Sequence, residues 1–173
     1  MKRNFIGYGD KKPKLSWPDK NHLAVSIVVN IEEGAELSIS SGDKENEHIY
    51  ENNKIKIENG NSDLCMESHF EYGLRAGIWR IFNLLDKYKV GVTFSCCSQA
   101  LEKSPWLIDE ILKRGHEISA HGVKWISHAN LTAKEEEKII QDCYSSILRL
   151  TGTPPMGWHT RSSTSPYTRD LLI

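Results

Sequence analysis

The order of hydrophobic and polar positions along the chain predicts alternating strands and helices. Short runs of β-branched and aromatic residues are typical of strands buried in a parallel sheet, and hydrophobic residues that recur every three or four positions are typical of amphipathic helices. The expected strands cover residues 23–30, 90–96, 116–121 and 156–158, and the expected helices cover residues 67–88, 98–114 and 132–150. This alternation favours βα units that form a parallel sheet or barrel.

Local signals mark where several of these helices begin and end. Pro105 interrupts the helix over residues 98–114, and Gly115 follows its last turn. Thr132 and Glu135 have the spacing of a capping box, which predicts the start of the next helix. A further helix is expected to open at Pro166, because proline is well tolerated in the first turn.

Two segments do not follow the strand and helix patterns. Residues 1–22 are polar and rich in Lys and Pro, which predicts an arm that wraps the surface. Residues 35–64 are rich in Asn, Ser, Glu and Lys and have little periodicity, so we interpret them as an inserted segment or a mobile loop.

The chain contains no sign of a second domain, so residues 1–173 are interpreted as a single domain. Its last expected helix stops at Ile173 after a few apolar residues. Parallel β/α barrels usually close with about eight strands, whereas the pattern here predicts four. We therefore expect the domain to be incomplete at its C-terminal end.

Composition and charge narrow the classes of partner and compartment. The formal net charge is −1 and the basic residues form no stripe, so neither nucleic acid nor an anionic membrane is expected as a partner. No apolar run approaches the ~20 residues of a membrane span, and no apolar stretch follows the basic N-terminus as in a signal peptide. The four cysteines form no C-x-x-C pair, which favours buried, reduced thiols in a cytoplasmic protein.

Candidate catalytic residues lie at or just after three expected strand ends, where parallel α/β folds gather their reactive groups. These positions are occupied by Glu32 and Glu33, by His121, and by Trp158 and His159. Successive strand side chains point to opposite faces, so only one of the two glutamates is expected at the barrel mouth unless the chain bends at Gly34.

A glutamate at such a mouth could act as a general base, because loss of solvent raises the pKa of a carboxyl group. The alternative interpretation is a solvated acidic turn. His121 is either a catalytic residue or an ordinary buried histidine. If residues 122–125 form a helical turn, His121 and Trp125, four residues apart, lie on the same face of it. The acidic run Glu135–Glu137 is interpreted as the solvated first turn of a helix.

Two of these segments resemble motifs of a known family. Residues 115–121 (GHEISAH) are similar to the second motif of the polysaccharide deacetylases, the NodB-homology group of carbohydrate esterase family four. Residues 30–34 (NIEEG) stand where that family carries its paired-aspartate motif. The resemblance implies a distorted, seven-stranded β/α barrel of the NodB type. It also places the family's catalytic base on Glu32 and its metal ligands on Glu33, His121 and Trp125.

Trp125 changes what this resemblance implies, because an indole ring cannot ligate zinc and a catalytic zinc usually has three protein ligands. A Glu-His-Trp set resembles the metal-independent, deacetylase-like allantoinases. Further segments similar to that subgroup are residues 5–9, 17–18, 30–36, 66–68, 71–73, 75–80 and 157–158. His159 departs from the tyrosine expected after Gly157 and Trp158.

The resemblance therefore implies a hydrolase of carbon–nitrogen bonds that opens the ring of allantoin, a small-molecule substrate, to give allantoate. Glu32, Glu33 and His121 would be catalytic, and Trp125, Trp158 and His159 would line the pocket, without a cofactor. The inserted segment would narrow the pocket and help to build a homo-oligomer. Two alternatives stay open: a metal-dependent polysaccharide deacetylase that uses Zn²⁺ or another divalent metal, with His128 as the nearest candidate ligand, and an inactive truncated remnant.

Overall fold

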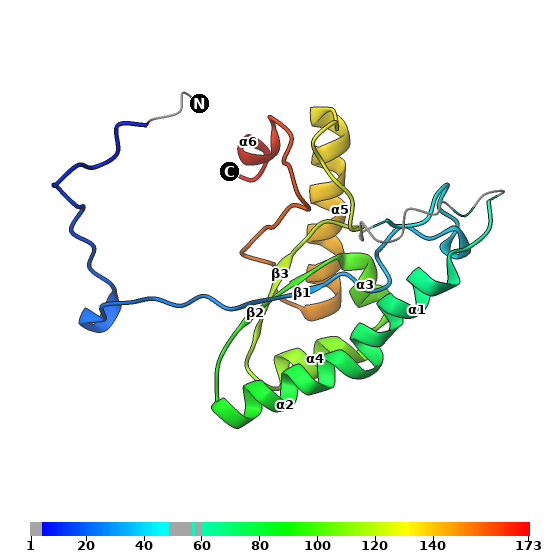
Figure 1. Cartoon of the computed structure of the whole chain (residues 1–173), viewed down its shortest axis with the longest axis horizontal. Coiled ribbons are helices and arrows are strands. Elements are labelled where there is room, and N and C mark those ends of the chain that lie inside the picture. The colour runs from blue at the N-terminus through cyan, green and yellow to red at the C-terminus, as the bar shows by residue number, and fades with distance from the viewer. Residues whose placement is uncertain (1–4, 49–56, 58–59) are drawn as a thin grey trace.

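A computed structural model describes residues 5–48, 57 and 60–173 and contains a parallel β-sheet. Its three strands are β1 (Val28–Ile31), β2 (Thr93–Cys96) and β3 (Glu117–Ala120), in that spatial order. Ile31, Cys96 and Ala120 pair across the sheet at the last position of each strand. The carboxyl ends of all three strands therefore lie side by side (Figure 1).

Helices follow each strand, which confirms the α/β fold expected from the sequence. They are α1 (Leu64–Tyr72) and α2 (Ile78–Tyr88) after β1, α3 (Ser98–Lys103) and α4 (Trp106–Leu112) after β2, and α5 (Ala133–Thr151) and α6 (Thr168–Leu171) after β3. Two short 3-10 turns cover Pro18–Lys20 and Ile39–Ser41. In Figure 1, α1 and α2 run on as one long rod, and α6 packs against α5.

The hydrophobic core lies between the sheet and these helices. Phe82 of α2 packs against Phe94 of β2 with ring centroids 5.6 Å apart. The largest buried apolar side chains are Phe82, Phe94, Leu101, Leu107, Ile111 and Ile147. Buried apolar side chains of α2, α3, α4 and α5 meet in one cluster, so the apolar face of each helix holds it against the sheet.

Most local signals for helix ends are confirmed, but the expected start at Pro166 is wrong, because α6 begins at Thr168 after the N-cap Tyr167. Pro105 separates α3 from α4, and Gly115 takes the left-handed conformation, with φ +74°, that ends the second of them. Thr132 and Glu135 form both hydrogen bonds of the capping box at the start of α5. Gly152 closes α5 in the left-handed region.

The first predicted strand is shorter than expected. Only Val28–Ile31 pair with β2, and Leu23 and Val25 are each 74% exposed. The prediction of a strand buried on both faces over residues 23–30 is therefore wrong, because the chain before Val28 leaves the sheet. The fourth predicted strand is reduced to one bridge, between Ala120 and Trp158.

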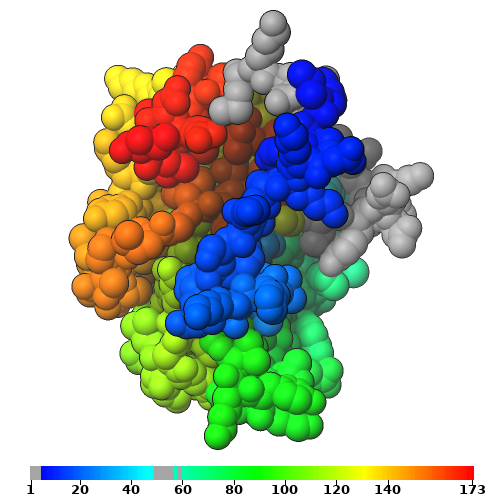
Figure 2. Space-filling model, turned by 90° about the vertical axis from the view of Figure 1, so that its left-hand side faces the viewer, coloured from blue at the N-terminus to red at the C-terminus, as the bar shows by residue number. Residues whose placement is uncertain are grey.

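The two irregular segments take different forms. Residues 5–27 are exposed throughout, and in Figure 1 this arm extends away from the sheet rather than wrapping the surface; in Figure 2 it stands in front of the body. Within the inserted segment, residues 35–48 include five buried residues: Ala35, Glu36, Ser38, Asn46 and Glu47. The rest of this prediction falls partly on residues 49–56 and 58–59, outside the described residues.

All four cysteines are free, and Cys96, Cys97 and Cys143 are buried as expected, whereas Cys65 is exposed. Among the described helices, none combines the length and the apolar character that a membrane span requires.

Candidate active site

A tight turn after β1 presents two neighbouring carboxylates. The backbone N–H of Ala35 donates to the carbonyl of Glu32 over 2.8 Å, and Gly34 takes φ +89°, a conformation that glycine adopts without strain. From α3, the side-chain amide of Gln99 donates to the carbonyl of Gly34 over 2.9 Å. The turn is therefore fixed by the helix that follows β2.

Glu32 and His121 meet at the carboxyl ends of β1 and β3. The distance from Glu32 Oε1 to His121 Nε2 is 3.2 Å, and Asn30 Nδ2 donates to the same carboxylate oxygen over 3.0 Å. The side chain of His121 is 5% exposed and that of Glu32 is 18% exposed. The pair thus lies mostly out of solvent, and its carboxylate keeps some access to it.

One hydrogen bond assigns the proton on the His121 ring. Nδ1 lies 3.1 Å from the carbonyl oxygen of His159, and because a carbonyl only accepts, Nδ1 carries a proton. Nε2 faces Glu32 Oε1, so a proton on either atom would make this contact a hydrogen bond. Such a contact can take up a proton and release it again, as general acid–base catalysis requires.

Two buried thiols donate hydrogen bonds to the backbone of the loop that carries His121. Cys97 Sγ donates to the carbonyl of His121 over 3.3 Å, and Cys143 Sγ donates to the carbonyl of Gly122 over 3.2 Å. Burial raises the pKa of Cys143 to about 11 and raises that of Cys97 further. Both thiols therefore stay protonated at neutral pH and act as donors rather than nucleophiles.

Glu33 points away from His121 and packs against the helix that follows. Its Oε1 lies so close to Gly73 that a Cβ built there would be 1.9 Å away, and Gly73 opens the π-helical segment Gly73–Gly77 between α1 and α2. Burial raises the pKa of Glu33, against the lowering effect of backbone hydrogen bonds, and the charges of Glu32 and Glu36 add to the rise. The two glutamates thus face different surroundings, as strand alternation predicts.

Trp125 lies beside the turn after β1 but not on a helical turn, because residues 122–125 form an irregular bend. Its backbone N–H donates to the carbonyl of Ala35 over 2.9 Å. Its indole ring packs between Phe70, with centroids 6.2 Å apart, and the guanidinium of Arg161, 3.7 Å from the ring centroid. The ring is therefore held on two sides.

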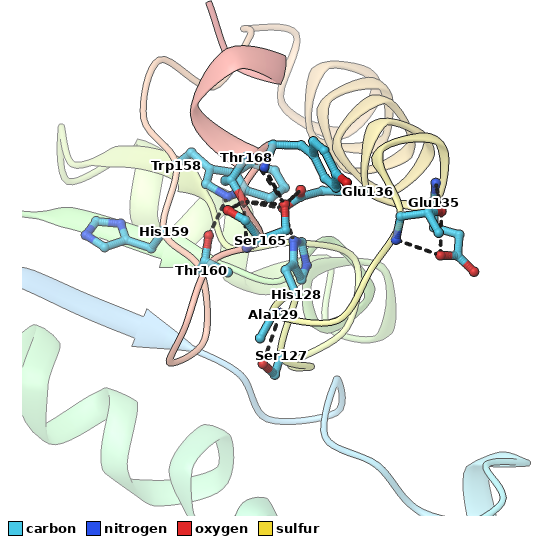
Figure 3. A network of polar contacts seen from close by, with 12 residues as sticks. Ser127, His128, Ala129, Glu135, Glu136, Trp158, His159, Thr160, Ser165 and Thr168 are labelled. Atoms are coloured by element: carbon cyan, nitrogen blue, oxygen red, sulfur yellow. Dashed lines mark hydrogen bonds and ion pairs between the residues drawn. The ribbon is translucent and has the colours of Figure 1, made fainter. Parts of the chain in front are cut away.

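Trp158 and His159 point to different sides of the chain (Figure 3). The ring of His159 lies 6.3 Å from that of His121, and its Nδ1 is 3.2 Å from Ser95 Oγ. Trp158 turns toward His128 and lines an apolar groove of about 560 Å³ beside α5 and α6. The structure thus brings together Glu32, His121 and His159, while Glu33 and Trp158 face other surroundings.

A second Glu–His pair is wholly internal. His128 Nδ1 lies 2.9 Å from Glu136 Oε1, Thr168 Oγ1 donates to that oxygen over 2.5 Å, and Ser165 donates to the other (Figure 3). Burial disfavours the charge of Glu136, but these hydrogen bonds outweigh it and lower its pKa. Glu136 is 0% exposed, so the prediction of a solvated acidic run over residues 135–137 is wrong at its central residue.

Sequence reasoning missed Glu136, Arg161 and the close approach of Gly73 to Glu33. For Glu136 a signal existed: it lies seven residues before Cys143 and eleven before Ile147, which puts all three on the buried face of α5. The contacts of Arg161 and Gly73 join residues far apart in sequence, and no local pattern marks them.

The donor set does not fit the three-ligand metal site of family-four deacetylases. Of the expected ligands, His121 faces Glu32, Glu33 packs against Gly73, and Trp125 supplies no donor; His128 is buried with Glu136 rather than grouped with them. Over residues 5–48, 57 and 60–173, no three His, Cys, Asp or Glu side chains are grouped so that they could hold a metal ion. The expectation of a metal-free site stays a prediction.

Relatives of known structure share this arrangement of elements. A PuuE allantoinase is 35% identical, with a TM-score of 0.87, over 99% of this chain and 57% of its own. A Pseudomonas aeruginosa PAO1 protein assigned to the polysaccharide deacetylases is 34% identical, with a TM-score of 0.88 and the same coverage. Both likenesses include the strand ends that carry Glu32 and His121.

Sequence comparison points to the same group. A Schizosaccharomyces pombe protein, also assigned to the polysaccharide deacetylases, is 34% identical over 83% of this chain and 46% of its own length. The chain thus spans about half the length of this relative and of the two solved structures. The family model of polysaccharide deacetylase matches residues 59–172, and the chain belongs to that family.

Proposed function

We propose that the complete protein is a hydrolase that opens a cyclic amide, with allantoin as substrate and allantoate as product. The observation that carries this proposal is the Glu32–His121 contact of 3.2 Å at the strand ends. The resemblance adds a tryptophan, Trp125, at the sequence position of the family's third metal ligand. The 35% identity to a PuuE allantoinase supports the choice of substrate. This chain spans about half of that relative, so the proposal allows the complete protein to supply further catalytic groups.

In the first step, the Glu32 carboxylate takes a proton from water as the water oxygen adds to the ring carbonyl carbon. Asn30 holds the carboxylate by its 3.0 Å hydrogen bond, which leaves the second oxygen, Oε2, to receive the proton. The carbonyl becomes an oxyanion in this step. Glu32 rather than Glu33 is the base, because Glu33 packs against Gly73 and away from His121.

In the second step, the tetrahedral intermediate collapses and the ring C–N bond breaks. The Glu32 carboxyl gives the proton it took up to the departing nitrogen, and the carbon side becomes a carboxylic acid. His121 orients the Glu32 carboxyl, because its own ring is fixed by the hydrogen bond from Nδ1–H to the carbonyl of His159. One positioned acid–base group contributes about 10²–10⁴-fold, and positioning of the substrate must supply much of the remainder.

Binding of the ring is assigned to Trp125, whose backbone is hydrogen-bonded to Ala35, and to His159, whose ring lies 6.3 Å from that of His121. Trp125 presents an apolar, planar surface that suits a flat heterocycle. The exposed His159 ring offers hydrogen bonding near His121. Trp158 lines the groove beside α5 and α6.

A metal-dependent polysaccharide deacetylase is the second candidate, favoured by the family match over residues 59–172. By the resemblance, Glu33 and His121 would then be ligands, and a third donor would have to come from elsewhere in the complete protein. Homo-oligomerisation and a cytoplasmic location stay predictions.

Assays of the complete protein with both substrate classes separate the two candidates. We expect allantoate from allantoin, at a rate that prolonged treatment with EDTA or 1,10-phenanthroline leaves unchanged, and no acetate from an N-acetylglucosamine oligomer. Acetate release that the chelator abolishes and Zn²⁺ restores would instead establish the deacetylase. Turnover of neither substrate would leave the inactive remnant as the better account.

A further inference from the structure

Arg161 joins three segments that are far apart in the sequence. Its Nη1 and Nη2 bind Glu47 Oε2 and Oε1 over 2.7 and 2.8 Å, and Nη1 also donates to the carbonyl of Trp125 over 2.7 Å. The side chain of Glu47 is 4% exposed and that of Arg161 is 21% exposed. This is a two-pronged, largely buried ion pair between the inserted segment and the chain after Trp158.

The same guanidinium covers one face of the Trp125 ring, 3.7 Å from its centroid, and Phe70 contacts the ring from another side. Ser127 and Arg161 also form a parallel bridge, so the two backbones run together here. Residues 122–127 lack helix or extended strand, and these contacts take the place of regular structure in fixing Trp125.

The contact needs the shape of arginine as well as its charge. A planar guanidinium can grip both carboxylate oxygens and stack on an indole at the same time, whereas a lysine ammonium offers a single point of charge. Glu47 orients the guanidinium plane, and the plane in turn sets the tilt of the indole. The backbone of Trp125 is hydrogen-bonded to Ala35, three residues after Glu32, so this tilt is set next to the proposed base.

We propose that Arg161 is a positioning and specificity-determining residue, which with Glu47 forms a clamp that holds Trp125 as a rigid wall of the substrate pocket. The inference rests on the proposed function for the substrate. Glu47 lies in the inserted segment. The shape of the pocket around the substrate therefore depends on that segment, through the Glu47–Arg161 pair. A substitution that loosens the clamp should raise KM for a planar ring more than it lowers kcat, because Glu32 and His121 stay in contact.

A double-mutant cycle in the complete protein tests the clamp. Arg161→Lys keeps the charge and loses the two-pronged, stacked geometry, and we expect it to raise KM for allantoin about tenfold. In a Trp125→Phe background the same substitution should change KM less than twofold, since the indole that the clamp positions is gone. Arg149→Lys is the matched control, because Arg149 is exposed and pairs with Glu102 on the surface. Equal effects of Arg161→Lys in both backgrounds would overturn the inference.

A second readout does not depend on turnover. Acrylamide quenching of Trp125 fluorescence, obtained as the difference between proteins with Trp125 and with Trp125→Phe, should increase when Arg161→Lys is added. Unchanged quenching would contradict the clamp even if allantoin is a substrate. Increased quenching in a protein that does not open allantoin would support the clamp and reject the proposed function.

Discussion

The molecule contains two Glu–His pairs of similar length and opposite character. Glu32 and His121 lie 3.2 Å apart at the carboxyl ends of the strands, and Glu136 and His128 lie 2.9 Å apart under α5 and α6. Glu32 keeps 18% of its side-chain surface exposed, whereas Glu136 keeps none. Each pair joins a carboxylate to an imidazole, so chemistry alone does not distinguish them.

The difference lies in what else each carboxylate binds. Both oxygens of Glu136 are occupied, by His128 and Thr168 on one side and by Ser165 on the other. Glu32 Oε1 accepts from Asn30 and contacts His121 Nε2, and its second oxygen stays available for water or substrate in the proposed mechanism. A saturated, buried pair fixes structure, and a partly open pair at strand ends can perform catalysis.

The largest expected effect is on stability, from Glu136→Gln in the complete protein. The amide leaves His128, Ser165 and Thr168 without their shared charged acceptor, and breaking a buried pair in this way costs about 3–5 kcal/mol in free energy of unfolding. Chemical denaturation monitored by circular dichroism measures the change. Glu137→Gln, at an exposed neighbour, should stay within about 0.5 kcal/mol of wild type. A comparable small change for Glu136→Gln would remove the distinction between the two pairs.

A smaller effect is expected at the cap of the same helix. Thr132→Ala removes the side chain that accepts from the Glu135 N–H and should lower the free energy of unfolding by about 1 kcal/mol. Thr132→Ser, which keeps the hydroxyl, serves as the control. If the two variants were equally stable, the capping box would contribute nothing to anchoring α5 over the Glu136 network.

The smallest expected effect is the pH dependence contributed by Glu33. Its folded pKa is raised above the ordinary value of 4.5, so the folded protein holds the proton more tightly than the unfolded chain does. The free energy of unfolding should therefore fall as pH rises from 4.5 through the raised pKa, and Glu33→Gln should lack that fall. Denaturation series across this range measure the slope for both proteins. A slope unchanged by Glu33→Gln would show that the carboxyl of Glu33 is not desolvated.

The sequence predicted the βα alternation because each helix and strand carries its own periodicity and its own end signals, such as Thr132 and Gly152. It placed Glu32 and His121 at strand ends because position along a parallel strand is a local property. Their mutual contact, 89 residues apart, depends on the register of β1, β2 and β3 and could not be read locally. Glu136 was misinterpreted because its charge suggested solvent, whereas its position on the face of α5 indicated burial.

Pocket details were the least predictable part. Trp125 was identified as a residue that cannot bind metal, but its actual partners come from residues 70 and 161. The ion pair that orients Arg161 reaches to Glu47, 114 residues away in the sequence. Such contacts follow from how loops meet after folding, and no local pattern marks them.

The central claim is that the open Glu–His pair performs the chemistry, and kcat/KM of Glu32→Gln in the complete protein tests it most directly. We expect a fall of about 10²–10⁴-fold in allantoin hydrolysis with an unchanged unfolding midpoint, because the amide fits the site but cannot take a proton from water. A kcat/KM within a few-fold of wild type would contradict the assignment, and a loss confined to Glu33→Gln would move it to the neighbouring carboxylate.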